Sequence, residues 1–103
     1  MNRVTLVGNL GNIPEANHTT SGKKVVNFTM ATNKNYLNNS GEKVTDTEWH
    51  NVVVWGKLAD VVEQHFEKGK KYLVEGEIKT ETYEKNGEKK YSTKIVMNNF
   101  EFL

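Results

Sequence analysis

Hydrophobic and polar residues alternate along several short stretches of the chain, with the period of two that is typical of strands. In the clearest stretch, Val26, Phe28 and Met30 share one face. The predicted strands are residues 3–10, 25–33, 47–55, 71–83 and 90–102. Asn86 and Gly87, between the last two strands, predict a hairpin turn because both residue types readily adopt positive φ.

One segment has a helical period instead. Apolar residues from Leu58 to Phe66 recur every three or four positions, which predicts an amphipathic helix, and Gly69 is expected to end it. Residues 12–24 are rich in turn residues, and the polar segment 33–46 predicts a long loop. The order favours an all-β fold, a five-stranded OB-fold barrel with one α-helix between strands 3 and 4. Other small barrels and α+β domains share this order.

Length and composition narrow the class of protein. The 103 residues suffice for one domain, and 36% hydrophobic with 26% charged residues is typical of a folded globular chain. The net charge is only +1, so the overall balance does not indicate nucleic-acid binding. Cysteine is absent, and neither a signal peptide nor a bilayer-spanning run is found. We therefore expect a cytoplasmic location without membrane attachment.

The sequence offers no catalytic motif. His18, His50 and His65 are scattered, and no cluster has metal-ligand spacing. A glycine-rich phosphate loop and a nucleophile motif are also missing. The prediction is a protein that is not an enzyme and needs no cofactor or metal.

The two tryptophans lie in one predicted strand, residues 47–55. Trp49 and Trp55 have the same parity, opposite to that of Val52 and Val54. The valines supply a core face, and a narrow barrel has little room for two inward indoles, which favours outward tryptophans. Val53 shares the tryptophan side and weakens this argument, and large aromatics are often core residues.

Outward aromatic rings are natural partners for nucleic-acid bases, because every base has a π-face and stacking does not read sequence. Tyr36 precedes the polar segment, and Tyr83 lies beside the predicted hairpin turn. With Trp49 and Trp55 they make four candidate stacking residues. The cations interleaved with them are expected to neutralise backbone phosphates: Arg3, Lys34, Lys43, Lys57 and Lys79.

Several segments together resemble the bacterial and phage single-stranded DNA-binding (SSB) proteins. They are residues 3–11, 47–59, 68–69 and 74–78, followed by Tyr91, and they match in order and spacing over nearly the whole chain. The resemblance implies an OB-fold that binds and protects single-stranded DNA during replication, repair and recombination. It also implies that the family's four base-stacking positions correspond to Tyr36, Trp49, Trp55 and Tyr83.

The resemblance further implies a cytoplasmic, nucleoid-associated protein that assembles as a homotetramer. It places His50 in a contact between subunits; the alternative is that His50 is an ordinary strand residue without such a role. The strand edge that carries Val4 and Leu6 is the expected pairing edge. Residues 1–103 are interpreted as a single binding domain without the flexible linker and acidic tip typical of the family, so recruitment of replication proteins is not predicted. A primosomal accessory OB protein and an RNA chaperone remain as alternative functions.

Overall fold

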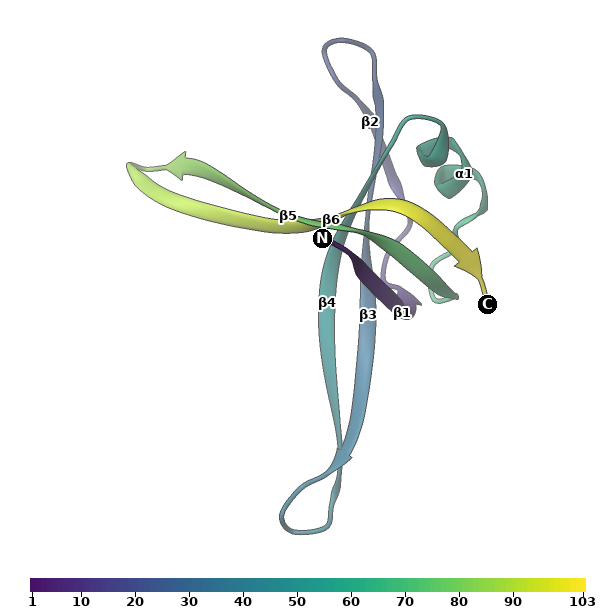
Figure 1. Cartoon of the computed structure of the whole chain (residues 1–103), viewed down its shortest axis with the longest axis vertical. Helices are drawn as coiled ribbons and strands as arrows, with labels where there is room; N and C mark the ends of the chain where they lie inside the picture. Colours follow the sequence, from purple (N-terminus) through teal and green to yellow (C-terminus); the bar gives the residue numbers. More distant parts are fainter.

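The computed structural model describes all residues, Met1–Leu103, as six strands and one helix (Figure 1). The strands are β1 (Val4–Leu10), β2 (Glu15–His18), β3 (Lys24–Leu37), β4 (Lys43–Trp55), β5 (Lys71–Lys85) and β6 (Glu88–Phe102). The helix α1 (Lys57–His65) follows β4, as the sequence predicts.

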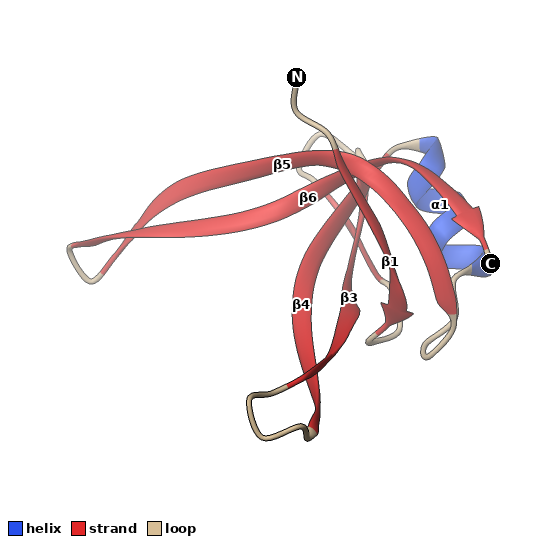
Figure 2. Ribbon diagram, turned by 60° about the horizontal axis from the view of Figure 1, so that its bottom comes forward, coloured by secondary structure: helices blue, strands red, loops and turns tan.

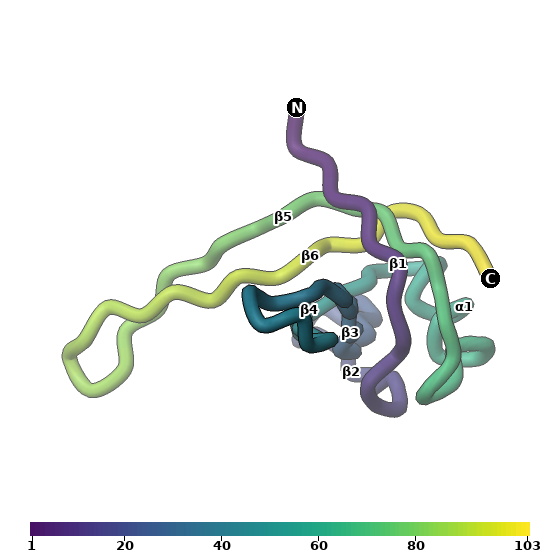
Figure 3. The backbone as a smooth tube through the Cα atoms, turned by 90° about the horizontal axis from the view of Figure 1, so that it is seen from below, coloured from purple at the N-terminus to yellow at the C-terminus, as the bar shows by residue number.

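Five of the strands close into a barrel, whose curvature is visible in Figures 2 and 3. The sheet has the order β1-β5-β6-β4-β3-β2, and β1 also pairs with β3, which closes five strands into a barrel and leaves β2 outside it, attached to β3. The closing pairs are Asn9 with Ala31 and Leu10 with Met30. The pairing of β4 with β6 is parallel and extends over two residue pairs only. The predicted five-stranded OB-fold barrel with one helix is confirmed.

Inward side chains of the strands fill the barrel. Val26, Phe28 and Met30 of β3 are buried together, as their alternation predicts. They pack with side chains from every other barrel strand and from the helix: Leu10, Val52, Val54, Ala59, Val62, Phe66, Tyr72, Val74, Ile95 and Met97. Where β1 crosses β3, the two backbones come so close that a Cβ on Gly8 would overlap the carbonyl oxygen of Ala31. Glycine is therefore required at the crossing.

The helix is held to the barrel by both apolar and ionic contacts. Ala59 and Val62 are its buried residues, and the Nζ atom of Lys24 on β3 lies 2.7 Å from Asp60 and 2.6 Å from Glu63. The hydrogen bond to Asp60, followed by that to Glu63, raises the pKa of Lys24, so this lysine stays protonated at neutral pH. The prediction that Gly69 ends the helix is wrong. The helix ends at His65, and Gly69 lies in the turn before β5 with φ +87°.

Two long hairpins extend beyond the barrel, and Figure 1 shows them pointing in different directions. The prediction of a loop over residues 33–46 is wrong, because β3 and β4 stay paired out to Leu37 and Lys43 and only five residues form the turn. The second hairpin, β5–β6, turns at Asn86 and Gly87 with φ of 55° and 78°, as predicted. We call these the β3–β4 arm (residues 33–47) and the β5–β6 arm (residues 77–94).

The arms account for the extended shape. The radius of gyration is 15.9 Å, whereas a compact domain of this length has about 13 Å. The segment 12–24, predicted as turns only, also contains a strand, since β2 pairs with the start of β3 from Glu15 to His18. Four polar or small residues, Glu15-Ala16-Asn17-His18, carry no strand signal of their own.

We expect replacement of Leu10 by alanine to lower the free energy of unfolding by ~2–5 kcal/mol, because the change leaves a cavity in the core. Leu10 is 2% exposed and belongs to a closing pair of the barrel. Ile13 is 75% exposed, so Ile13→Ala is the matched control. Urea denaturation followed by tryptophan fluorescence measures both variants, and equal unfolding midpoints would contradict the role given to Leu10.

Candidate nucleic-acid interface

The outer face of β4 carries both tryptophans. Trp49 is 60% exposed and Trp55 is 36% exposed, whereas Val52 and Val54 are buried in the core. The outward orientation that parity predicts is confirmed. Val53 lies on the tryptophan side but is only 5% exposed. Trp55 follows Trp49 by six positions, which places the two indoles about 20 Å apart along β4.

The ring of Trp49 rests on the connection that follows β1. A Cβ on Gly11 would overlap the Cζ3 atom of Trp49 and lie 2.7 Å from Thr29 Oγ1, so the indole packs directly on the glycine backbone. Asn12 fixes this connection on β3, because its Oδ1 atom accepts a hydrogen bond from the backbone N–H of Thr29 at 2.9 Å. The N–H of Gly11 also donates to the carbonyl of Thr29 at 2.8 Å. The exposed ring thus packs on a backbone segment that hydrogen bonds hold to β3.

Trp55 has a cation over its ring. The Nζ atom of Lys23 lies 5.3 Å from the ring centroid, within the range of a cation–π contact. Sequence reasoning did not select Lys23. The contact of Lys23 with Trp55 depends on the register of β3 with β4, in which Val25 lies opposite Trp55. This register cannot be deduced from the sequence of either strand alone.

The two candidate tyrosines lie on the arms rather than beside the tryptophans. Tyr36 is 46% exposed and pairs with Val44; by register it is on the opposite face of the β3–β4 ribbon from Trp49. Tyr83 is 49% exposed and lies opposite Lys90 on the β5–β6 arm. Tyr91, 66% exposed, was not selected as a stacking residue and lies on the other face of that arm. The four predicted rings are therefore spread over the barrel and both arms.

A polar groove lies on the tryptophan face of the barrel. It has a volume of about 310 Å³ and is walled by β3 and β4 on one side and by Ser92 and Lys94 of β6 on the other. Asn51 and Val53, the two outward residues between the tryptophans, form part of its lining. The remaining lining residues are Asn12, Glu15, Asn27, Phe28, Thr29 and Val52. The groove is thus bordered by amide, hydroxyl and ammonium groups and by the carboxylate of Glu15.

The predicted phosphate-binding cations fall into two groups. Lys34, Lys43 and Lys57 form no ion pair within 4 Å, so their charges are free. Arg3 is bound to Glu75 at 2.8 Å, and Lys79 lies 3.9 Å from Glu81. Arg3 and Lys79 would have to exchange a carboxylate for a phosphate.

The residues predicted for subunit contacts lie near one open strand edge. Val4 and Leu6 are partly buried against the core, so it is the β1 backbone, with Thr5 and Val7 beside it, that faces outward. Only Asn9 and Leu10 pair with β3, which leaves the edge from Val4 to Gly8 without a partner strand on that side. His50 is half-buried, and its Nε2 atom lies 2.9 Å from Thr32 Oγ1.

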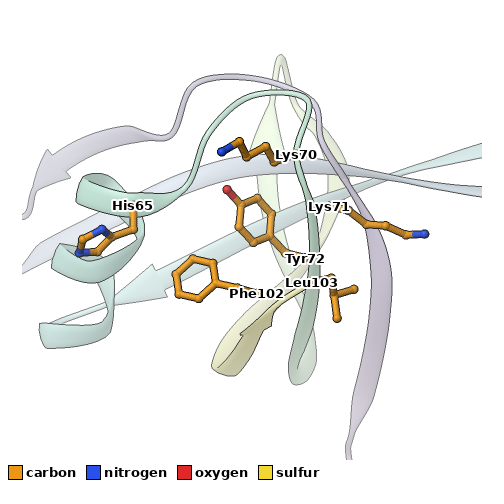
Figure 4. Close-up of a pocket in the computed structure, with 6 residues that line it drawn as sticks. All are labelled: His65, Lys70, Lys71, Tyr72, Phe102 and Leu103. Carbon is orange, nitrogen blue, oxygen red and sulfur yellow. The ribbon is translucent and has the colours of Figure 1, made fainter.

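A second cavity, whose lining residues Figure 4 shows, lies beside the end of the helix. It has a volume of about 430 Å³ and is lined by His65, Lys70, Lys71, Tyr72, Phe102 and Leu103. Phe66 stacks on Tyr72 with centroids 4.1 Å apart, so this cavity borders the aromatic end of the core. The hydrogen bond to Glu67 raises the pKa of Lys70, which stays charged.

The structure contains no group of three or more histidine, aspartate or glutamate side chains that could hold a metal ion. Its one helix is neither long nor apolar enough to cross a membrane.

Comparison with known proteins agrees with this geometry. The model of the single-strand binding protein family matches residues 1–103. The chain is 45% identical over 105 residues to single-stranded DNA-binding protein 1 of Chlorobaculum tepidum, covering 100% of this chain and 65% of that relative.

Two solved structures have the same fold over the whole of this chain. One is the Plasmodium falciparum SSB complex with ssDNA, with a TM-score of 0.91, 28% identity and 95% of that chain covered. The other is a deletion mutant of the single-stranded DNA binding protein from Thermus aquaticus, with a TM-score of 0.86, 27% identity and 50% of that chain covered. The chain therefore belongs to the single-strand binding protein family.

Proposed function

We propose that this protein binds single-stranded DNA with little sequence preference and protects it during replication, repair and recombination. The observation that carries the proposal is the pair of exposed indoles, Trp49 and Trp55, on either side of a polar groove. Exposed aromatic rings next to a groove suit a strand with unpaired bases, whereas the bases of a duplex are stacked on one another and unavailable.

The relatives support the same proposal. The similar Plasmodium falciparum structure is a complex with ssDNA, and the Chlorobaculum tepidum relative is a single-stranded DNA-binding protein. This chain spans 65% of the length of that relative, so functions of the remaining part are not transferred. The protein acts by binding alone, without catalysis, cofactor or metal.

Bases stack on Trp49 and Trp55 at the barrel and on Tyr36 and Tyr83 along the arms. The free cations Lys34, Lys43 and Lys57, together with Lys23 beside Trp55, bind phosphates. Arg3 and Lys79 contribute when they release their carboxylates. Because so few charges take part, stacking supplies more of the affinity than phosphate neutralisation does.

Titration with oligo(dT), duplex DNA and an RNA oligonucleotide of equal length, followed by tryptophan fluorescence, tests the proposal. We expect strong quenching by oligo(dT) and weak or no quenching by the duplex. Replacing Trp49 or Trp55 by alanine should each remove ~1–3 kcal/mol of binding free energy, or about 5- to 150-fold in Kd. Replacement by phenylalanine should retain most of the affinity. Tighter binding to RNA would favour an RNA chaperone, and no binding to any of the three would reject the proposal.

The contact between the Trp49 ring and Gly11 leads to a second prediction. Gly11→Ala should displace the indole, change the tryptophan emission of the free protein and weaken oligo(dT) binding about fivefold, as for a loss of ~1 kcal/mol of stacking. In a protein that already carries Trp49→Ala, the same change should cost no further affinity, because the two residues act as a unit. An equal loss in both backgrounds would show that Gly11 acts independently of the ring.

Self-association is proposed to use the open edge of β1. An unpaired strand edge readily pairs with another chain, and pairing of two β1 edges around a two-fold axis is the first step toward a homotetramer. His50 and the backbone beside Val4 and Leu6 would lie at that contact.

Sedimentation equilibrium tests this assembly. We expect a species of four chains for the unmodified protein and smaller species for Val7→Lys, because the edge contact would bring two equal charges together. Val7 is 45% exposed, and Ile13→Lys at a more exposed position away from the edge is the control. A monomer at micromolar concentration, or no difference between Val7→Lys and the control, contradicts the proposed edge.

A further inference from the structure

One carboxylate of the β5–β6 arm contacts two lysines on the face that leads into the groove. The Oε1 atom of Glu81 lies 3.0 Å from the Nζ atom of Lys94 and 3.9 Å from that of Lys79. In the strand register Lys79 lies directly opposite Lys94, and Glu81 lies opposite Ser92. Two lysines facing each other repel, and Glu81 neutralises part of this repulsion.

The same face continues toward the tryptophan strand. Ser92 and Lys94 line the groove together with Asn51 and Val53, the outward residues between Trp49 and Trp55. Farther out on that face Tyr83 lies opposite Lys90. A DNA single strand that runs from the groove to Tyr83 would therefore pass over Lys94, Lys79 and Glu81.

We propose that Lys94 and Lys79 form a phosphate-binding pair that Glu81 occupies when no DNA is bound. The inference rests on the proposed function and assigns Lys94 as a further phosphate contact. A carboxylate and a phosphate offer lysine the same kind of anionic oxygen, so the two compete for one position. The side chain of Glu81 is 48% exposed, and those of its partners Lys79 and Lys94 are 62% and 23% exposed. The carboxylate is therefore solvated even in its closer pair with Lys94, and ion pairs of this kind are weak enough for a phosphate to displace the carboxylate.

The consequence is a lower affinity and a flatter salt dependence than two free lysines would give. When a phosphate replaces a carboxylate on a lysine, fewer counterions are released overall than when a phosphate binds a lysine that has no partner. Glu81 thus acts as an internal competitor that makes the strand easier to release. Glu15 also lines the groove, but it has no lysine within ion-pair distance and cannot act in this way.

Glu81→Gln removes the carboxylate while keeping the size of the side chain. Oligo(dT) titrations over a range of salt concentrations should give a slope of log K against log[salt] steeper by about 0.7, the value for one additional phosphate on a single strand. If the curves of the two proteins converge near 1 M salt, affinity at about 50 mM is about eightfold higher for the variant.

Glu67→Gln is the matched control. Glu67 forms an ion pair of 2.8 Å with Lys70, so the control frees a lysine and changes net charge equally, but beside the second cavity. Figure 1 shows the end of α1, where Glu67 follows, on the opposite side of the barrel from the β5–β6 arm. We expect its slope and affinity to match those of the unmodified protein. Adding Lys94→Gln to Glu81→Gln should abolish the gain.

The outcomes separate this inference from the proposed function. If the unmodified protein binds oligo(dT) and Glu81→Gln changes neither the slope nor the affinity, the role given to Glu81 is wrong and the proposed function still holds. An equal gain from Glu67→Gln would also overturn it, because net charge alone would then be responsible. Reduced thermal stability of Glu81→Gln with unchanged binding would mean that Glu81 only relieves repulsion. Failure of the unmodified protein to bind oligo(dT) rejects the proposed function itself.

Discussion

Closure of the five-stranded barrel is the constraint on which the other features depend. β1 must remain paired with β5 from Val4 to Asn9 and still reach β3 at Asn9 and Leu10. In a closed narrow barrel the inward side chains fill the interior, and successive residues of a strand point to opposite faces. Because Val52 and Val54 point inward, Trp49 and Trp55 have to point outward. The same constraint that builds the core therefore creates the exposed aromatic face.

The two arms depend on the barrel for their structure, because they have no hydrophobic core of their own. Outside the barrel nearly all residues of both ribbons are exposed, and a two-stranded ribbon alone is only marginally stable in water. The barrel fixes their register, and side-chain pairs across the strands support it: Thr45 bonds to Asn35 at 2.9 Å and Thr80 to Thr93 at 3.0 Å. The ribbons can thus carry Tyr36 and Tyr83 far from the barrel while keeping their backbone hydrogen bonds.

The barrel could be predicted from the sequence because one face of each strand is buried. The alternation of Val26, Phe28 and Met30, and the parity of Trp49 and Trp55, report that burial directly. The segment 33–46 carries no such signal, since a ribbon solvated on both faces has no reason to alternate, and its polar residues predict a loop from sequence alone. Contacts that depend on register between distant strands were also missed, as with Lys23 over Trp55. Sequence patterns thus report what is buried, whereas the solvated parts of the site require the fold.

Charge pairing explains how a chain with a net charge of +1 can present a cationic path. Lys24 and Lys70 are paired with carboxylates on or next to the helix, so these positive charges stabilise the fold. Arg3 is paired with Glu75 on β5 and becomes available to a phosphate only when that pair opens. Lys34 and Lys43 on one arm and Lys57 at the start of the helix remain unpaired. The acidic residues therefore offset cations that stabilise the barrel and leave others free. Overall net charge is a poor guide to nucleic-acid binding in such a protein, because what matters is which cations the fold leaves without a partner.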